Sequence, residues 1–283
     1  IVSEGLRRIN RAPRSAFRYL FAGKKEEVTA QSLAFVAAPR VNAAGRMGDA
    51  QSALRFFTSE NESEVYELAC RLGEYNLSRQ QLCDEAYRAA KEKLRAEGAW
   101  GNVIMLQDED WNQGLIGIVA ARLVEEFRRP CILFARRGDR LKGSARTVEN
   151  INIYEALKAC SAHVLEFGGH AQAAGVTIEC EQFGPLKEAL DAYIGKTYGS
   201  GAGLPSFSVC AEVGEIDLET ARELERLEPC GVGNKRPLFA CPADEPAARR
   251  LKDGSPHLSL KAGTLDLVWI GGEKALPVLR SDL

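Results

Sequence analysis

A glycine-rich segment with one histidine, residues 168–175, contains the residue types best suited to chemistry. It reads Gly168-Gly169-His170-Ala171-Gln172-Ala173-Ala174-Gly175. Glycines adopt positive φ and let main-chain N–H groups approach an anion, and His170 adds a donor that can be charged near neutral pH. The small side chains predict a short helix after the glycines, with its N-terminus directed at the same point. The segment therefore predicts a phosphate-binding turn; the alternative is a Gly-rich turn whose histidine is satisfied in the core.

Five segments of the sequence together resemble the RecJ family of DHH phosphoesterases. The octet is similar to the GGHxxAAG signature of the DHHA1 domain, and residues 38–50 resemble the RecJ stretch PRxNAAGRxxxA. Segments 110–120, 143–147 and 227–234 fit the same family in the same order, the last at the start of an OB-fold domain. The resemblance implies a single-strand-specific 5′–3′ exonuclease that hydrolyses phosphodiester bonds in DNA repair and recombination.

The resemblance also implies two divalent cations, Mn²⁺ or Mg²⁺, held by aspartates and an Asp-His-His motif. Two-metal phosphoryl chemistry needs several ligands that converge on ions about 4 Å apart. The sequence contains no Asp-His-His, and its three histidines, His163, His170 and His257, have no acidic residue or second histidine at ligand spacing. We therefore expect no metal site in this chain, which looks like a fragment that follows the catalytic domain and lacks hydrolytic activity by itself.

Residue types and resemblance together assign one catalytic residue and a set of contacts. His170 is expected to stabilise charge on the phosphoryl group. The expected phosphate or DNA contacts are Arg46, Asn42, Ser144, Arg146, Gly168, Gly169, Trp111, Asn112 and Asn234. Arg146 follows the small residues Ser144 and Ala145, so its guanidinium could reach a phosphate and form two hydrogen bonds with it. The alternative is a surface ion pair. Asn42 could orient Arg46 or cap a helix.

Two of these contacts carry a specific alternative. Trp111 could stack on a base, but a tryptophan before an apolar helix is more often a packing residue. RecJ-like proteins commonly have histidine where this chain has Asn112, which argues against proton handling there and leaves hydrogen bonding open.

The composition favours a cytoplasmic protein in which local basic patches bind a polyanion. The net charge is −2, yet residues 1–25 hold seven basic residues and one acidic residue, and residues 122–149 are also rich in arginine. Such patches suit a groove that follows a phosphate backbone, although each could be a solvated surface. The eight cysteines form no CxxC pair and predict a reducing compartment. No membrane segment is evident, and we expect a monomer that binds single-stranded DNA and possible partners such as single-strand-binding protein.

Periodicity predicts an α/β fold in four parts. Residues 1–60 are helical, and 61–98 form a long connector helix with apolar residues at three- or four-residue steps. Residues 99–198 alternate strands and helices, as expected of a DHHA1-type domain with a central sheet. A linker at 199–205 precedes a partial OB-fold β-barrel at 205–283. Two alternatives remain: a DHH-family oligoribonuclease or nucleotide phosphoesterase, and a non-catalytic single-stranded-DNA-binding scaffold.

Overall fold

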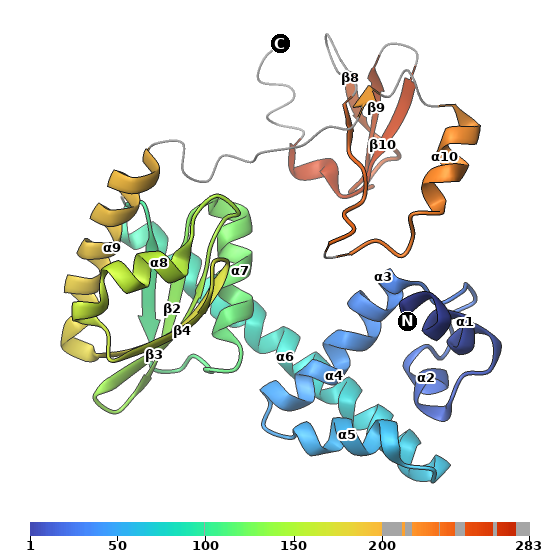
Figure 1. Cartoon of the computed structure of the whole chain (residues 1–283), viewed down its shortest axis with the longest axis horizontal. Helices are drawn as coiled ribbons and strands as arrows, with labels where there is room; N and C mark the ends of the chain where they lie inside the picture. The colour runs from blue at the N-terminus through green and yellow to red at the C-terminus, as the bar shows by residue number, and fades with distance from the viewer. Residues whose placement is uncertain are drawn as a thin grey trace. The chain divides into compact units, whose positions relative to one another are not determined.

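A computed structural model describes residues 1–98, 100–199, 211–212, 217–231, 233–240, 247–262 and 265–275. The chain, drawn in Figure 1, divides into two compact units, Ile1–Pro205 and Ser206–Leu283. Most of the predicted linker, residues 200–205, lies outside the described residues. In the described part, no helix combines the length and apolar character needed to cross a bilayer.

The first unit begins with a group of short helices. They are α1 (Val2–Arg11), α2 (Ser15–Leu20), α3 (Ala30–Ser32), the π-helical turn η1 (Leu33–Ala37), α4 (Ala38–Arg46) and α5 (Ala50–Thr58). Asp49 begins α5, where its carboxylate accepts a hydrogen bond from Ser52 N, as N-cap aspartates commonly do. Phe56 and Leu72 are fully buried in a helical core. This core fixes the C-terminal end of α4, which carries Arg46.

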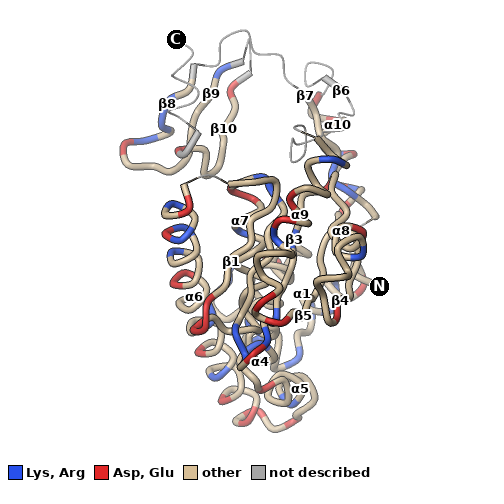
Figure 2. Tube along the Cα trace, turned by 90° about the vertical axis from the view of Figure 1, so that its left-hand side faces the viewer, with Lys and Arg blue, Asp and Glu red and all other residues tan. Residues whose placement is uncertain are grey.

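A helix of 36 residues, α6 (Glu62–Glu97), follows and confirms the predicted long helix. Asn61 caps its first turn by accepting hydrogen bonds from Ser63 N and Glu64 N. At 1.5 Å per residue the helix is roughly 50 Å long. Its first half contributes to the helical core and its second half to a separate α/β core. Basic and acidic residues are interspersed along its exposed side (Figure 2), so α6 connects two cores within one unit.

The α/β part is a five-stranded mixed sheet in the order β1-β2-β3-β5-β4. Its elements are β1 (Ile104–Asp108), α7 (Ile116–Phe127), β2 (Cys131–Arg137), β3 (Arg140–Arg146), α8 (Ile153–Ala159), η2 (Ser161–His163), β4 (Glu166–His170), β5 (Ala173–Glu179), η3 (Cys180–Gln182) and α9 (Phe183–Tyr198). Only β1 and β2 are parallel. The fold class predicted from the alternating strands and helices is confirmed.

Helices cover the two faces of this sheet unequally. Phe134 of β2 contacts Phe183 of α9, and Phe167 of β4 contacts Tyr154 of α8, so α8 and α9 pack on one face (Figure 1). Helix α7 packs on β2 and β3 from the opposite face, where a Cβ on Gly117 would lie against β3 side chains. The α7 face of β4 and β5 has exposed or half-exposed residues, which leaves this end of the sheet open.

The second unit is small and largely β. Its described elements are β6 (Ala211–Glu212), α10 (Leu218–Glu225), β7 (Phe239–Ala240), β8 (Ala247–Arg250), β9 (Leu258–Ala262), β10 (Leu265–Trp269) and η6 (Gly272–Ala275). Strands β8, β9 and β10 form an antiparallel sheet, and β6 pairs with β7. This arrangement fits the predicted partial OB fold.

Candidate functional site

The Gly-Gly-His segment is a β-hairpin. Residues 166–170 form β4 and residues 173–179 form β5, with Ala171 and Gln172 in the turn. The predicted short helix after the glycines is therefore wrong, and the predicted strand at 175–180 is longer and begins at Ala173. The run of small residues is compatible with a helix locally, but pairing of β5 with both β3 and β4 decides the conformation.

Gly169 allows the two hairpin strands to approach closely. Its φ is 150°, and a Cβ there would lie against the Ala173 carbonyl oxygen and 2.6 Å from Ala174 Cα. Both are backbone atoms that cannot move alone, so any larger residue would push β4 away from β5. Gly168, by contrast, has open space around its Cβ position. The second glycine of the pair is therefore required for strand pairing, whereas the structure leaves room for a larger side chain at the first.

The turn of the hairpin is fixed to the segment that follows β3. Thr147 N donates to the Gln172 carbonyl at 3.3 Å, and Ile153 N donates to the Ala171 carbonyl at 2.9 Å. The Gln172 side-chain amide donates to the Glu149 carbonyl at 3.1 Å. These bonds hold the hairpin end, and with it His170, in one position relative to Arg146 at the end of β3.

His170 and Arg146 lie on the same face of the sheet. Arg146 pairs with Ala173, and Ala173 pairs with His170, so the three residues form one row across β3, β5 and β4. Directly opposite residues in a sheet project to the same side. Two strand spacings separate the outer residues by about 10 Å at Cα, with only the Ala173 methyl between them. Within the sheet, no side chain larger than this methyl stands in the row between the imidazole and the guanidinium.

The next row on this face is also almost free of side chains. Ser144 pairs with Gly175, which pairs with Gly168. Both glycines are exposed and Ser144 is half-buried. Little side-chain bulk therefore covers the main chain in this row.

His170 is an exposed side chain with a defined hydrogen-bond direction. Gln172 N donates to His170 Nδ1 at 3.2 Å, so the proton of the neutral ring is on Nε2. Nε2–H is then a donor available on the open face. The alternative of a histidine satisfied in the core is excluded because the residue is exposed.

Arg146 is half-buried and held in place by its own strand. Its Nη1 donates to Ser144 Oγ at 3.1 Å and to the Ala145 carbonyl at 2.7 Å. Burial, followed by repulsion from the Arg46 guanidinium, lowers the pKa of Arg146, although an arginine stays charged at neutral pH. No carboxylate pairs with it among the described residues. A bound anion would offset both the burial of the guanidinium and its repulsion by Arg46. The alternative expectation, a surface ion pair of Arg146, is not observed.

The C-terminal end of α4 brings a second arginine to this site. Arg46 Nη1 donates to the Gly114 carbonyl at 2.9 Å, and Asn112 Oδ1 accepts from Gly114 N at 2.8 Å. Asn42 is exposed one turn earlier on α4 and makes no cap hydrogen bond there. The structure thus gathers Arg46, Asn112 and Arg146, which are far apart in sequence, around the start of α7.

Two residues expected to contact DNA have local structural roles. Trp111 is only 4% exposed and belongs to the α/β core, which is what the packing alternative expects. Asn234 is in the second unit, where its side-chain amide donates to the Leu227 and Pro229 carbonyls at 2.8 and 3.3 Å. Its amide donors are occupied within their own loop.

One partly buried arginine of the long helix was not identified from the sequence. Arg79 on α6 is half-buried, and its Nε is buried without a hydrogen-bond partner among the described residues. The sequence signal that could have identified Arg79 is its position, because it occupies an apolar position of the helical repeat.

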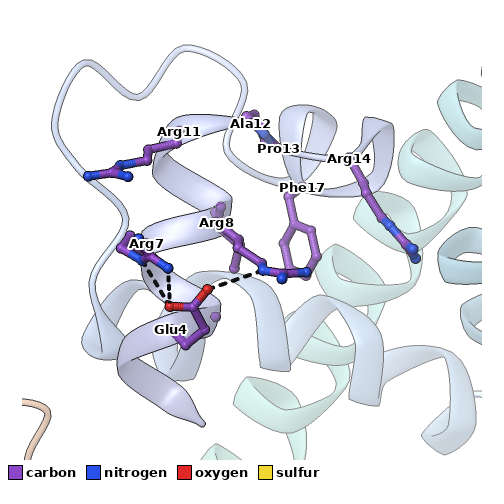
Figure 3. A pocket seen from close by; sticks show the side chains of 10 residues that line it. Glu4, Arg7, Arg8, Arg11, Ala12, Pro13, Arg14 and Phe17 are labelled. Atoms are coloured by element: carbon purple, nitrogen blue, oxygen red, sulfur yellow. Dashed lines mark hydrogen bonds and ion pairs between the residues drawn. The ribbon is translucent and has the colours of Figure 1, made fainter.

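A separate hollow of about 680 Å³ lies on α1 and α2 and is rich in arginine. Figure 3 shows Glu4 bridging Arg7 and Arg8, with Arg11 and Arg14 turned away from it. These ion pairs are exposed, and exposed pairs contribute little to stability. The hollow accounts for the basic patch at the start of the sequence but contains none of the expected site residues.

Residues that could hold a metal do not gather in the described part of the chain. No group of three or more His, Cys, Asp or Glu side chains there has suitable geometry. The residues present therefore do not fit a two-metal centre, and the site on the sheet is one of cations and hydrogen-bond donors.

Comparison with known proteins gives two family matches. Residues 101–196 match the DHHA1 domain and residues 209–272 match the RecJ OB domain. The chain is 34% identical over 283 residues to the single-stranded-DNA-specific exonuclease RecJ of Thermus thermophilus, covering 98% of this chain and 40% of that protein. It is 32% identical over 238 residues to the exonuclease of the same name from Bacillus subtilis, covering 83% of this chain and 30% of that protein.

The structure agrees with these sequence matches. RecJ from Thermus thermophilus in complex with Mn²⁺ superimposes with a TM-score of 0.80 at 31% identity, over 95% of this chain and 40% of that chain. The complex with Mg²⁺ gives a TM-score of 0.77 at 32% identity. The chain spans less than half the length of these relatives. With a DHHA1 domain followed by a RecJ OB domain, and with matches over nearly all of its length, the chain belongs to the RecJ family.

Proposed function

We propose that this chain is the strand-binding part of a RecJ-type exonuclease that hydrolyses single-stranded DNA from its 5′ end. The observation that carries the proposal is the row Arg146–Ala173–His170, which presents a guanidinium and an imidazole N–H on one open sheet face. A backbone phosphate in this row would accept hydrogen bonds from both side chains. The division into parts at 1–60, 61–98, 99–198 and 205–283 belongs to the same proposal.

The residues of the site have different roles in this proposal. Arg146 and Arg46 neutralise phosphate charge in the bound state, because guanidinium groups form strong charge-assisted hydrogen bonds with phosphate. Gly168 and Ser144 leave room for the strand, while Asn42 and Asn112 lie at its edge. His170 donates from Nε2 to a phosphoryl oxygen, where charge develops during hydrolysis.

Divalent cations are expected to act in the intact exonuclease, since the similar Thermus thermophilus structures are complexes with Mn²⁺ and Mg²⁺. Because the described residues form no metal-binding group, we derive no metal-dependent step from them. We expect the 283-residue chain alone to release no nucleotides from labelled single strands with manganese. Metal-dependent release that disappears in a His170→Ala variant would contradict this expectation.

The proposal extends to partner and compartment. The match to a RecJ OB domain at 209–272 supports a strand as ligand, because OB folds bind oligonucleotides; an enzyme acting on a dinucleotide or a nucleotide phosphate does not need such a domain. The six described cysteines are free, which fits a reducing compartment such as the cytoplasm. We further propose that the protein acts as a monomer, with single-strand-binding protein as a partner.

Binding of a fluorescent 5′-phosphorylated oligothymidylate to the chain tests the proposal. Arg146→Met should weaken binding roughly ten-fold or more, because a hydrogen bond to a charged group contributes about 1.5–3 kcal/mol. His170→Ala should weaken it less, since its donor acts mainly in the transition state. Arg140→Met on the same strand is the matched control, because Arg140 is already paired with Glu179 at 3.5 Å. Equal affinity of wild type and Arg146→Met would refute the proposed site.

A further inference from the structure

Arg79 occupies an apolar position of the long helix. The buried residues of α6 on the same side are Val65, Leu68 and Leu72 in the helical core and Cys83, Ala90 and Leu94 in the α/β core. Arg79 follows Leu72 by seven residues and precedes Cys83 by four, so all three share one face of the helix. Arg79 therefore lies on the core-facing side of α6, between the two cores.

The guanidinium of Arg79 is incompletely satisfied. Its Nη2 donates to Asn76 Oδ1 at 2.9 Å, and its Nε is buried without a partner. No carboxylate pairs with it in the described part of the chain. Arg122 on α7 provides a contrast, since its Nη1 is 2.6 Å from Asp84 Oδ1. A partly buried charge without a counter-charge is costly, so the position favours an anion that joins it from outside the chain.

Packing of α6 places Arg79 beside the end of α4 that carries Arg46. The hydroxyl of Tyr75, one turn before Arg79, donates to Asp49 Oδ2 at 2.9 Å, and Asp49 follows Arg46 by three residues. Arg46 Nη1 donates to the Gly114 carbonyl just before α7, and a Cβ on Gly117 of α7 would lie 2.7 Å from Arg146 Nη2. These contacts give a run of positive charge from α6 across the end of α4 to β3.

The three arginines in this run, Arg79, Arg46 and Arg146, bond only to neutral groups among the described residues. Arg46 donates to the Gly114 carbonyl and Arg146 to Ser144 and a carbonyl of its own strand. A single phosphodiester group carries one negative charge. Three unpaired guanidiniums therefore exceed what one phosphate can neutralise, and the site has capacity for a second.

We propose that Arg79 binds a second backbone phosphate of the strand, together with Arg46, beside the phosphate held at Arg146. This inference rests on the proposed function and adds to it a residue from the long helix. A strand that crosses from the sheet to α6 would contact all three arginines. Phosphate binding would explain why position 79 has a charged residue where the helical repeat predicts an apolar one.

Salt-dependent binding of the 283-residue chain tests this role. Affinity for the labelled 5′-phosphorylated oligothymidylate is measured by anisotropy between about 50 and 200 mM salt. Arg79→Met should weaken binding roughly ten-fold and reduce the slope of log affinity against log salt by about 0.7, the value for one phosphate on a single strand. Its unfolding temperature should be unchanged or higher, because methionine removes an unpaired buried charge without leaving a cavity.

Matched variants separate this role from a structural one. Arg88→Met makes the same change on the exposed side of α6, where, among the described residues, Nε bonds only to the Asp84 carbonyl, and should leave affinity and slope unchanged. Arg79→Lys keeps the charge but not the fork, so it should preserve the slope and weaken binding less than methionine does. If Arg79→Met fails to fold, Arg79→Lys decides: weakened binding supports the proposal, and wild-type affinity overturns it.

The failure of this inference is distinguishable from failure of the proposed function. Wild-type affinity and slope in Arg79→Met, with weakened binding in Arg146→Met, would overturn the role of Arg79 alone. Unchanged binding in both variants would overturn the site on the sheet as well. A lower unfolding temperature in Arg79→Met, with unchanged affinity of the folded protein, would make Arg79 a structural residue and also overturn the proposal.

Discussion

Replacing Gly169 with alanine should destabilise the protein far more than the same change at Gly168. The Cβ of residue 169 would lie 2.6 Å from Ala174 Cα, and the backbone has a φ of 150°, a region that is essentially restricted to glycine when ψ is extended. Overpacking costs about 1–3 kcal/mol and a strained backbone about 1–3 kcal/mol. Since β4 is an edge strand that can shift partly, we expect a total of roughly 2–4 kcal/mol.

Thermal unfolding monitored by circular dichroism measures this cost. A change of 1 kcal/mol shifts the unfolding temperature of a domain this size by about 2–4 °C, so Gly169→Ala should lower it by roughly 5–15 °C. Gly168→Ala adds the same methyl where no atom lies within 4 Å, and should shift it by only about 2 °C. Because Gly168 faces the proposed strand path, its variant should instead weaken DNA binding. Equal unfolding temperatures for the two variants would refute the close strand approach inferred at Gly169.

Two substitutions and one labelling experiment test particular features of the structure. The pKa of Asp49 is lowered chiefly by a hydrogen bond from Ser52. The ionised carboxylate therefore stabilises the fold above the ordinary carboxyl pKa, and this stabilisation is lost as the pH falls through the lowered pKa of Asp49. In unfolding curves measured at a series of pH values, Asp49→Asn should flatten the loss of stability below about pH 4. Burial raises the pKa of Cys131, so mass spectrometry should find this thiol unmodified by iodoacetamide at neutral pH until the protein unfolds. Gly117→Ala places a Cβ 2.7 Å from Arg146 Nη2, so it should weaken DNA binding without lowering the unfolding temperature; tight binding by this variant would show that the arginine need not occupy its present position.

The long helix and the alternating strands could be predicted because their signals are local. The apolar positions of α6 recur along one face, and Asn61 and Gly98 stand at its two ends, so periodicity and capping residues suffice. The hairpin at 166–179 could not be predicted in the same way. Its conformation depends on pairing between Arg146 and Ala173, which are distant in sequence, whereas the local run of alanine and glycine also fits a helix.

The site residues show the same division between local and non-local information. His170 and Arg146 were identified as candidates from residue type, but only the register across three strands shows that they share a face. Arg46 bonds to Gly114 and Arg146 lies beside Gly117, so both reach the start of α7. This arrangement depends on how α4 packs against α6 and cannot be predicted from spacing in the sequence. Trp111 shows why residue type alone leaves two readings, because an aromatic side chain suited to stacking is buried in the α/β core.

Hydrogen exchange of the 283-residue chain, measured by mass spectrometry with and without a single-stranded oligothymidylate, tests the central claim most directly. If the strand lies on the open sheet face, exchange should slow in peptides that cover the end of β3, the 166–173 hairpin segment and the start of α7. A duplex of equal length should protect these peptides less. Protection confined to residues 217–275, or equal protection by duplex and single strand, would contradict the account.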